Sequence, residues 1–173
     1  KVEKFDAIIL AAAGVGQDQT KFADALSGSY LASSKKAPIL LYTKGDLAEA
    51  NLAFIAENLS EDGTIYLLGG NVSIPAEVEA ALVEAGYNVK RLAGDDRYLT
   101  NLAILKEVGV EDAEEVLISG GQAFADSLSA SATGLPIMLV KNSLNQRQID
   151  FLKDPHGNDF TIIGGTKAVD VKV

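Results

Sequence analysis

The sequence predicts an α/β fold made of two tandem copies of one unit, with mostly parallel strands flanked by helices. Three observations lead to this prediction. Apolar runs of strand length alternate with segments of helical period, the connections between them are short, and sequences from the first half return in the same order in the second half. Such an alternation is typical of doubly wound α/β proteins.

Three pairs of segments carry the internal repeat. Residues 22–27 (FADALS) return as 124–129 (FADSLS), residues 37–41 (APILL) as 135–139 (LPIML), and residues 68–74 (LGGNVSI) as 163–169 (IGGTKAV). No histidine, lysine or second carboxylate stands at matching positions in both copies, so no catalytic acid–base pair recurs. A tandem α/β repeat of this kind favours a binding array over an enzyme.

Continuous apolar character predicts parallel strands that are covered on both faces. The runs lie at residues 8–13, 39–42, 65–68, 116–118, 137–140 and 160–163, and one further strand, 89–92, joins the two copies. Helical spacing between the runs, as in Phe22, Ala25, Leu26, Ser29 and Tyr30, predicts amphipathic helices. No linker rich in proline or serine separates the halves, so we expect them to pack together.

Several polar residues stand where helix caps are expected. Ser73 is expected to cap the helix that begins just after it, and Asp95 or Asp96 the helix of the second copy that follows the joining strand. Ser143 and Gln146 form a candidate capping box near the end of the second copy.

Composition excludes several classes of function. The 173-residue chain carries 15 basic and 24 acidic residues, a net charge of −9, and no cysteine. Nucleic acid binding needs clustered Lys and Arg, and disulfides or thiolate metal sites need Cys. No apolar run approaches the roughly 20 residues of a membrane-spanning helix. We therefore expect no nucleic acid or membrane partner, no metal and no cofactor.

Asp24 and Asp126 each lie two residues beyond a phenylalanine, near the start of the first helix of their copy. That position follows the carboxyl end of a strand, where open α/β sheets usually bind ligands, and the helix dipole stabilises a carboxylate there. Two interpretations stay open, namely a buried aspartate that bonds loop amides and an aspartate that contacts a ligand.

Two glycine pairs, Gly69–Gly70 and Gly164–Gly165, follow the third strand of each copy. Glycine permits a tight turn and the close approach of a ligand or another backbone, and turn geometry alone is the competing interpretation. Neither a dinucleotide fingerprint nor a phosphate loop ending in Gly-Lys-Ser/Thr occurs in the sequence. Both pairs belong to the candidate binding site.

Arg91 and Arg97 flank the turn at residues 94–96. A guanidinium is suited to bidentate contacts with phosphate or carboxylate, and equally to an internal salt bridge with a neighbouring aspartate. The single histidine, His156, lies in a Pro-His-Gly-Asn segment typical of an exposed turn. We therefore expect no catalytic role for it.

The run at residues 89–100 (VKRLAGDDRYLT) resembles the Arg-x-x-Gly-x-Asp-Arg-Tyr-x-Thr signature of the cell wall binding repeat 2 family. Further elements of the family follow in order at residues 116–121 (VLISGG), 124–129 (FADSLS), 136–139 (PIML) and 162–169 (IIGGTKAV). The first copy matches equally from Ile8 to Val78. We divide the chain into a first repeat, residues 1–88, lacking its N-terminal signature block, and a second, residues 89–173, incomplete at its C-terminal end.

The resemblance implies tandem Rossmann-like or flavodoxin-like repeats, usually three to a protein around a pseudo-threefold axis. It implies a secreted module on the Gram-positive cell surface, in S-layer and related wall proteins. Such a module is not an enzyme, and it anchors its parent protein non-covalently by binding an anionic wall polymer of the secondary polysaccharide or teichoic acid type. Further repeats of the parent protein and other surface-layer proteins are the other implied partners.

Two alternatives compete with wall anchoring: an architectural module that self-associates in a surface layer, and an α/β enzyme or nucleotide-binding domain. Within the anchoring hypothesis, Arg91 and Arg97 are expected to contact phosphate or carboxylate groups of the polymer. Asp24 and Asp126 are expected to shape the loops or to hold a cation. The longer first loop of the first copy, residues 14–20, is expected to give its site a different shape.

Overall fold

The computed structural model describes residues 4–13, 22–43, 47–110, 113–122, 124–153 and 159–170. The elements are β1 (Phe5–Ala12), α1 (Phe22–Lys35), β2 (Ile39–Tyr42), α2 (Glu49–Asn58), β3 (Leu59–Leu68), α3 (Ala76–Glu84), β4 (Asn88–Leu92), α4 (Arg97–Val108), β5 (Glu115–Gly120), α5 (Phe124–Ser131), β6 (Ile137–Val140), α6 (Gln146–Lys153) and β7 (Asp159–Ile163). All the predicted strands are present, so the predicted α/β alternation is confirmed. No helix within the described ranges is long and apolar enough to cross a membrane.

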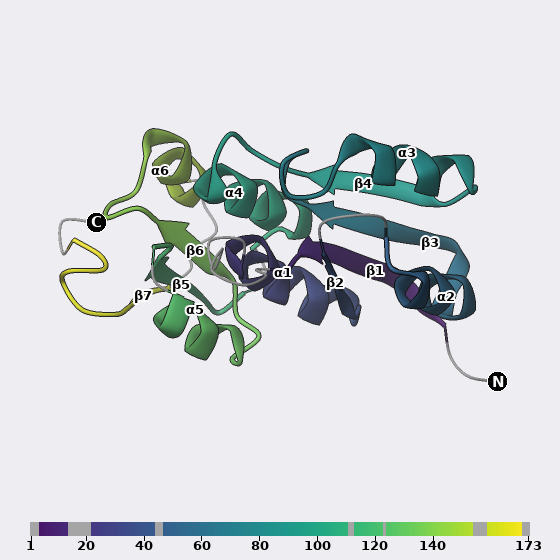
Figure 1. The fold of residues 1–173 in the computed structure, drawn as a ribbon. Coiled ribbons are helices and arrows are strands. Elements are labelled where there is room, and N and C mark those ends of the chain that lie inside the picture. The colour runs from purple at the N-terminus through teal and green to yellow at the C-terminus, as the bar shows by residue number, and fades with distance from the viewer. Residues whose placement is uncertain are drawn as a thin grey trace.

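The strands form two parallel sheets, which lie one beyond the other along the molecule (Figure 1). The first sheet has the order β2–β1–β3–β4 and the second the order β6–β5–β7. Leu10 of β1 pairs with Leu40 and Leu67, and Ile118 of β5 pairs with Met138 and Ile162. The first strand of each repeat therefore lies between its second and third, as in flavodoxin-like sheets.

The joining strand β4 completes the first sheet. It pairs with β3, although its sequence opens the second repeat when the chain is divided at residue 88. The signature block therefore supplies the edge strand of the first sheet. The rest of the block follows β4 at the carboxyl ends of the strands of that sheet. The division itself stays a prediction.

Helices cover both faces of the first sheet because its strands are apolar on both. On one face Ile8 and Leu10 pack with Ile55 of α2 and Leu82 of α3. On the other face Ile9, Ala11 and Leu68 pack with Leu31 of α1 and Ile104 of α4. This arrangement confirms the expectation drawn from the continuous apolar runs.

Helices α1 and α4 also pack against the second sheet. Leu102 and Leu105 of α4 join a core with Ile118 and Met138, to which α6 contributes Phe151. Ala23 of α1 joins the core on the opposite face, where α5 packs. The two repeats share these helices, so the expectation that the halves pack together is confirmed.

The buried face of α1 differs from the predicted one. The predicted face, which includes Phe22 and Tyr30, is only partly buried, whereas Ala23, Ser27, Gly28 and Leu31 are buried. A Cβ on Gly28 would lie 2.5 Å from Leu68 Cδ1, so α1 approaches β3 too closely for a larger residue. Small residues mark the buried face here, and periodicity of large apolar residues does not detect them.

Two of the predicted caps were wrong. Pro75 stands at the N-cap of α3 and makes no side-chain cap, while Ser73 bonds elsewhere. The capping box of α6 is formed by Asn145 and Gln148, two residues beyond the predicted pair, with both hydrogen bonds 3.0 Å long. Asp96 does cap α4, since its Oδ1 accepts a 2.8 Å hydrogen bond from the Leu99 amide.

Candidate functional site

A cavity of about 310 Å³ lies at the carboxyl ends of the strands of the first sheet. Its lining comes from the start of α1, from the turn after β3 at residues 70–73, and from residues 94–97, which lead into α4. The carboxyl ends of parallel strands meet at one edge of a sheet, which is why these three segments converge. The cavity brings together three of the predicted site residues, Asp24, Gly70 and Arg97.

The glycine turn forms one wall of this cavity. Gly69 has a φ of 99°, and a Cβ there would overlap the Asp24 carboxylate, so both backbone angle and space require glycine. Gly70 has open space on its Cβ side, and its carbonyl accepts hydrogen bonds from the amides of Ser73 and Ile74. The Gly70 backbone is therefore accessible to a ligand, whereas Gly69 serves the turn.

Asp24 lies beneath the glycine turn. Its side chain is buried, and Oδ2 accepts a 3.0 Å hydrogen bond from Ser73 Oγ. Burial raises the pKa of the Asp24 carboxyl, while the Ser73 hydrogen bond and the positive charge of Arg97 act in the opposite direction. The contact with Ser73 gives Asp24 a role in shaping the loop, and its edge still reaches the cavity.

Arg97 links the cavity to the second repeat. It lines the cavity from the first turn of α4, and its Nη1 donates a 2.8 Å hydrogen bond to the carbonyl of Gly121. The turn before it is held by a 3.0 Å hydrogen bond from the Gly94 amide to Thr100 Oγ1. A Cβ on Gly94 would overlap Leu99, so this turn also requires glycine. The turn thus positions the backbone of Arg97, and the Gly121 carbonyl holds one end of its guanidinium.

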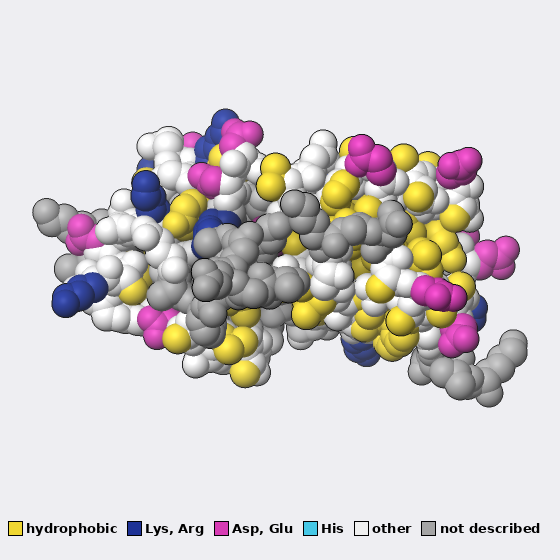
Figure 2. Space-filling model, in the orientation of Figure 1, with side chains coloured by type: hydrophobic (Ala, Val, Ile, Leu, Met, Phe, Trp, Pro, Cys, Tyr) yellow, Lys and Arg dark blue, Asp and Glu magenta, His cyan; other side chains and the backbone are white. Residues whose placement is uncertain are grey.

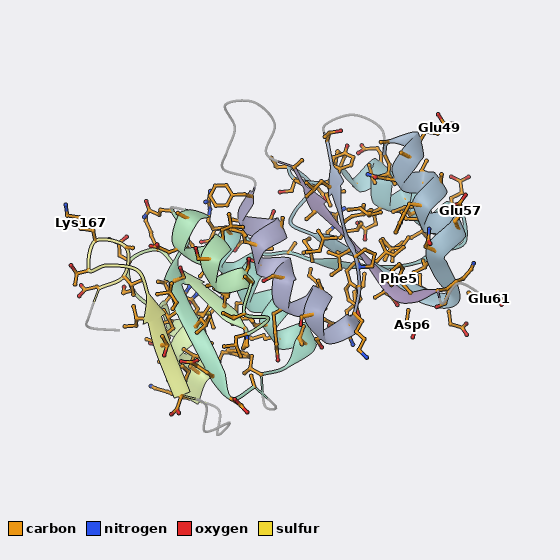
Figure 3. All side chains as sticks on the ribbon, turned by 90° about the horizontal axis from the view of Figure 1, so that it is seen from below. Phe5, Asp6, Glu49, Glu57, Glu61 and Lys167 are labelled. Atoms are coloured by element: carbon orange, nitrogen blue, oxygen red, sulfur yellow. The ribbon has the colours of Figure 1, made fainter. Side chains whose placement is uncertain are left out.

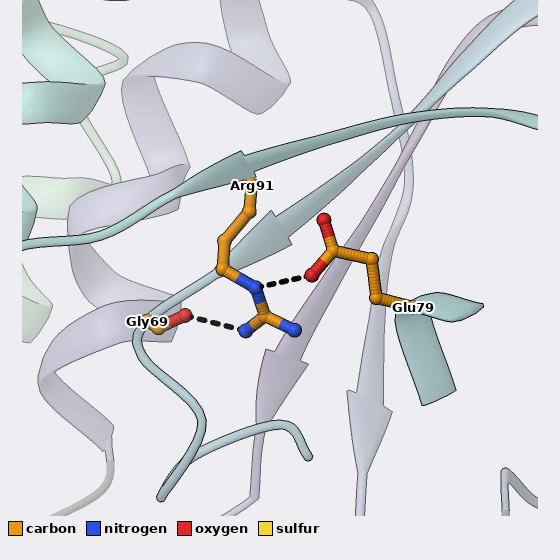
Figure 4. Close-up of polar contacts among 3 residues, drawn as sticks. All are labelled: Gly69, Glu79 and Arg91. Atoms are coloured by element: carbon orange, nitrogen blue, oxygen red, sulfur yellow. Dashed lines mark hydrogen bonds and ion pairs between the residues drawn. The ribbon is translucent and has the colours of Figure 1, made fainter. Parts of the chain in front are cut away.

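Arg91 lies outside the lining of the cavity, behind the glycine turn (Figure 4). Its Nε donates to Glu79 Oε2 at 2.7 Å, and its Nη1 donates to the Gly69 carbonyl at 2.8 Å. The buried Nη2 has no hydrogen-bond partner among the described residues. The ion pair thus joins Arg91 to a glutamate of α3 rather than to a neighbouring aspartate. A contact between Arg91 and a polymer stays a prediction.

The second repeat builds a similar turn. Gly164 has a φ of 112°, and a Cβ there would lie 2.7 Å from Asp126 Oδ2. Ala168 stands where the first repeat has Ser73, so Asp126 has no equivalent hydroxyl donor. Lys167 of this turn lies at the opposite end of the molecule from Glu49 and the other labelled acidic residues of α2 and β3 (Figure 3).

Sequence reasoning missed two polar side chains of the site, Ser73 and Thr100. Thr100 was within the signature run, but its bond to the Gly94 amide required the folded turn. The sequence predicts a cap role for Ser73, and the alanine at the matching position of the second repeat, Ala168, is the sequence signal that Ser73 acts locally in the first repeat. His156 and the loop at residues 14–20 lie outside the described residues.

The lining supports recognition of polar ligands. It offers a guanidinium, the exposed carboxylates of Asp95 and Asp96, and open backbone at Gly70. A guanidinium binds anionic groups, and carboxylates accept hydrogen bonds from hydroxyl groups. Within the described ranges no three His, Cys, Asp or Glu side chains converge in a way that could hold a metal ion.

Comparison with known proteins places the chain in a family. The pattern of cell wall binding domain 2 (CWB2) matches residues 1–79 and 91–173. The chain belongs to the CWB2 family. The solved structure of Cwp8 from Clostridium difficile has a TM-score of 0.85 and 33% identity, covering 98% of this chain and 28% of that one. Cwp6 from Clostridium difficile has a TM-score of 0.81 and 25% identity, covering 98% of this chain and 27% of that one.

Two proteins of Bacillus subtilis (strain 168) are similar to the CWB2 chain. The N-acetylmuramoyl-L-alanine amidase LytC is 28% identical over 155 residues, which are 87% of this chain and 30% of the amidase. The amidase enhancer is 33% identical over 124 residues, which are 69% of this chain and 17% of that protein. The chain therefore spans less than a third of each of these relatives. It is a cell wall binding module with a wall or surface location, and the resemblance seen in its sequence is confirmed.

Proposed function

We propose that this CWB2 module is non-catalytic and anchors a secreted surface protein to the Gram-positive wall by binding an anionic polymer of the secondary polysaccharide or teichoic acid type. One observation carries the proposal. The cavity at the carboxyl ends of the first sheet joins the glycine turn of one repeat to the signature block of the next. The lining thus includes residues of both repeats, which gives the signature residues at the junction of the repeats a role in the site.

Arg97 is the residue that contacts phosphate or carboxylate groups in this proposal. One of its five N–H donors is used by the Gly121 carbonyl, and the others are available toward the cavity. Asp95, which is exposed in the lining, accepts hydrogen bonds from sugar hydroxyls. Asp24 shapes the wall of the site, and Arg91 acts on it through Gly69.

The net charge of −9 does not prevent this binding. Interactions between exposed charges are screened over about 8–10 Å at physiological salt. The groups next to the ligand therefore decide whether an anionic group is attracted or repelled. The turn at Asp126, Gly164 and Gly165 supplies a second, weaker contact. Several weak contacts on one repetitive polymer add through effective concentration.

The test is sedimentation of the purified protein with Gram-positive cell walls, before and after the walls are stripped of anionic polymer. We expect binding to intact walls and its loss on stripping. Arg97→Gln should weaken binding about tenfold, the value of one charge-assisted bidentate contact. Lys35→Gln is the matched control, because this exposed lysine lies eleven residues beyond Asp24, about 16 Å along α1.

Two results would contradict the proposal. Equal binding to intact and stripped walls would exclude the anionic polymer as the ligand. Unchanged binding by a folded Arg97→Gln protein, checked by circular dichroism and thermal melting, would remove this cavity from the binding site.

Self-association is a second candidate function, favoured by the edge of the second sheet. β7 pairs with β5, and Phe160 and Ile162 are 48% and 40% exposed, whereas their counterparts in β3, Ile65 and Leu67, are fully buried. An exposed apolar strand edge is a template for pairing with another chain. Light scattering at rising protein concentration separates this function from polymer binding, since only self-association raises the mass without polymer.

A further inference from the structure

A second cavity lies beside the proposed polymer site. It has a volume of about 340 Å³ and opens between α4 and the start of α6. Gly94 and Asp95 line both cavities, so the two hollows meet across this turn. Each volume is at the lower end of the range for small-ligand sites, so a polymer would extend beyond either one alone.

Two cationic side chains line the second cavity, Lys106 from α4 and Arg147 from α6. They are 41 positions apart in the chain, and the fold brings them to one hollow. Both are exposed, and neither makes an ion pair or hydrogen bond with another described residue. The tertiary structure thus gathers two available positive charges next to the proposed site.

Two other cations of this region form ion pairs within the protein. Lys90 pairs with Glu107, and Arg91 pairs with Glu79. Lys106 and Arg147 therefore differ from Lys90 and Arg91, whose charges are engaged within the protein. In Figure 2 most of the visible lysine and arginine side chains lie in the half of the molecule that holds the second sheet, with acidic side chains among them.

The remaining lining suits a sugar-containing polymer. Leu99 and Leu102 give the hollow an apolar wall, against which the C–H face of a sugar ring can pack. Asp95 stands between the two cavities and repels anions, so it favours a hydroxyl-bearing unit there. Anionic groups are favoured on either side, at Arg97 and at the Lys106–Arg147 pair.

We propose that Lys106 and Arg147 form a second anion subsite, and that one polymer chain crosses the Gly94–Asp95 turn from the first cavity to this one. The subsite rests on the proposed function, since it extends the same binding site. Its ligand groups are the phosphates or carboxylates of the anionic polymer. Lysine supplies a point charge and arginine a planar donor pair, so the subsite accepts either group.

The experiment measures binding of the double variant Lys106→Gln/Arg147→Gln to intact cell walls across a series of salt concentrations. We expect apparent affinity to fall at least about fivefold at low salt, because two exposed ion pairs on a multivalent polymer are lost. The dependence on salt should also become weaker. The swapped variant Lys106→Arg/Arg147→Lys, which keeps both charges, should bind within about twofold of the original protein.

The matched control is Lys35→Gln/Lys153→Gln, which removes the same charge from two exposed lysines at the ends of α1 and α6. If both double variants bind alike, the subsite is excluded, while loss of wild-type binding on stripped walls still supports the proposed function. If the wild-type protein binds neither kind of wall, the proposed function fails and the subsite fails with it. All four substituted positions are exposed, so the variants should fold normally.

Discussion

Asn101 offers the sharpest test of how helix α4 is joined to the second sheet. This α4 side chain is fully buried and reaches the outer edge of β6. Its Nδ2 donates to the Ile137 carbonyl at 2.8 Å, and its Oδ1 accepts from the Leu139 amide at 2.9 Å. A third hydrogen bond, 3.2 Å long, runs to Ser27 Oγ of α1. The amide thus replaces a neighbouring strand and ties three elements together.

Asn101→Ala would leave the Ile137 carbonyl and the Leu139 amide buried without their partner. Each such group costs about 1–3 kcal/mol, so we expect the free energy of unfolding to fall by about 2–6 kcal/mol. That is a large part of the total stability of a domain, which is about 5–15 kcal/mol. Asn101→Asp should cost at least as much, because it sets a carboxylate oxygen against the Ile137 carbonyl.

The assay is urea unfolding followed by far-ultraviolet circular dichroism and by tyrosine fluorescence, whose agreement checks two-state behaviour. Asn51→Ala is the control. Asn51 makes the same kind of bond, from Nδ2 to the carbonyl of Leu41 in edge strand β2, but in an exposed position. Its loss should change stability by no more than about 0.5 kcal/mol. Equal effects of the two alanine substitutions would refute the reasoning.

Three further predictions concern the glycine turn, Asp24 beneath it and Arg91 behind it. Gly69→Ala should lower the melting temperature by several degrees, because the φ is positive and the Cβ would overlap Asp24, whereas Gly70→Ala should leave it unchanged; equal melting temperatures would contradict this. Burial raises the pKa of the Asp24 carboxyl above 3.8, its ordinary value. The protonated carboxyl therefore contributes its full stability below pH 3.8, and this contribution is lost as the pH rises through the folded-state pKa. Urea unfolding should therefore show Asp24→Asn gaining stability relative to the original protein as the pH rises above about 3.8, and a constant difference would exclude this titration. Arg91→Met should cost about 1.5–3 kcal/mol in the same assay, because the Gly69 carbonyl and Glu79 lose a charged donor, and a loss below 0.5 kcal/mol would contradict the contacts.

The sequence by itself determined the elements and the family. Continuous apolar runs such as Ile39–Tyr42 and Ile137–Val140 became strands with the same bounds, and Asp96 capped the helix that it precedes. Strands, caps and repeated motifs depend on residues close together in the chain. Local residue order therefore carries the signal for them, and the ordered motifs carry the resemblance.

Only the tertiary structure decided which candidate residues meet. Arg91 and Arg97 look alike in sequence, yet one is paired with Glu79, twelve positions away, and the other lines the cavity and reaches the Gly121 carbonyl. Lys106 and Arg147 gave no sequence signal at all. The partner of a long charged side chain depends on how separate helices and strands are placed, and packing sets that placement over distances that periodicity and spacing do not encode.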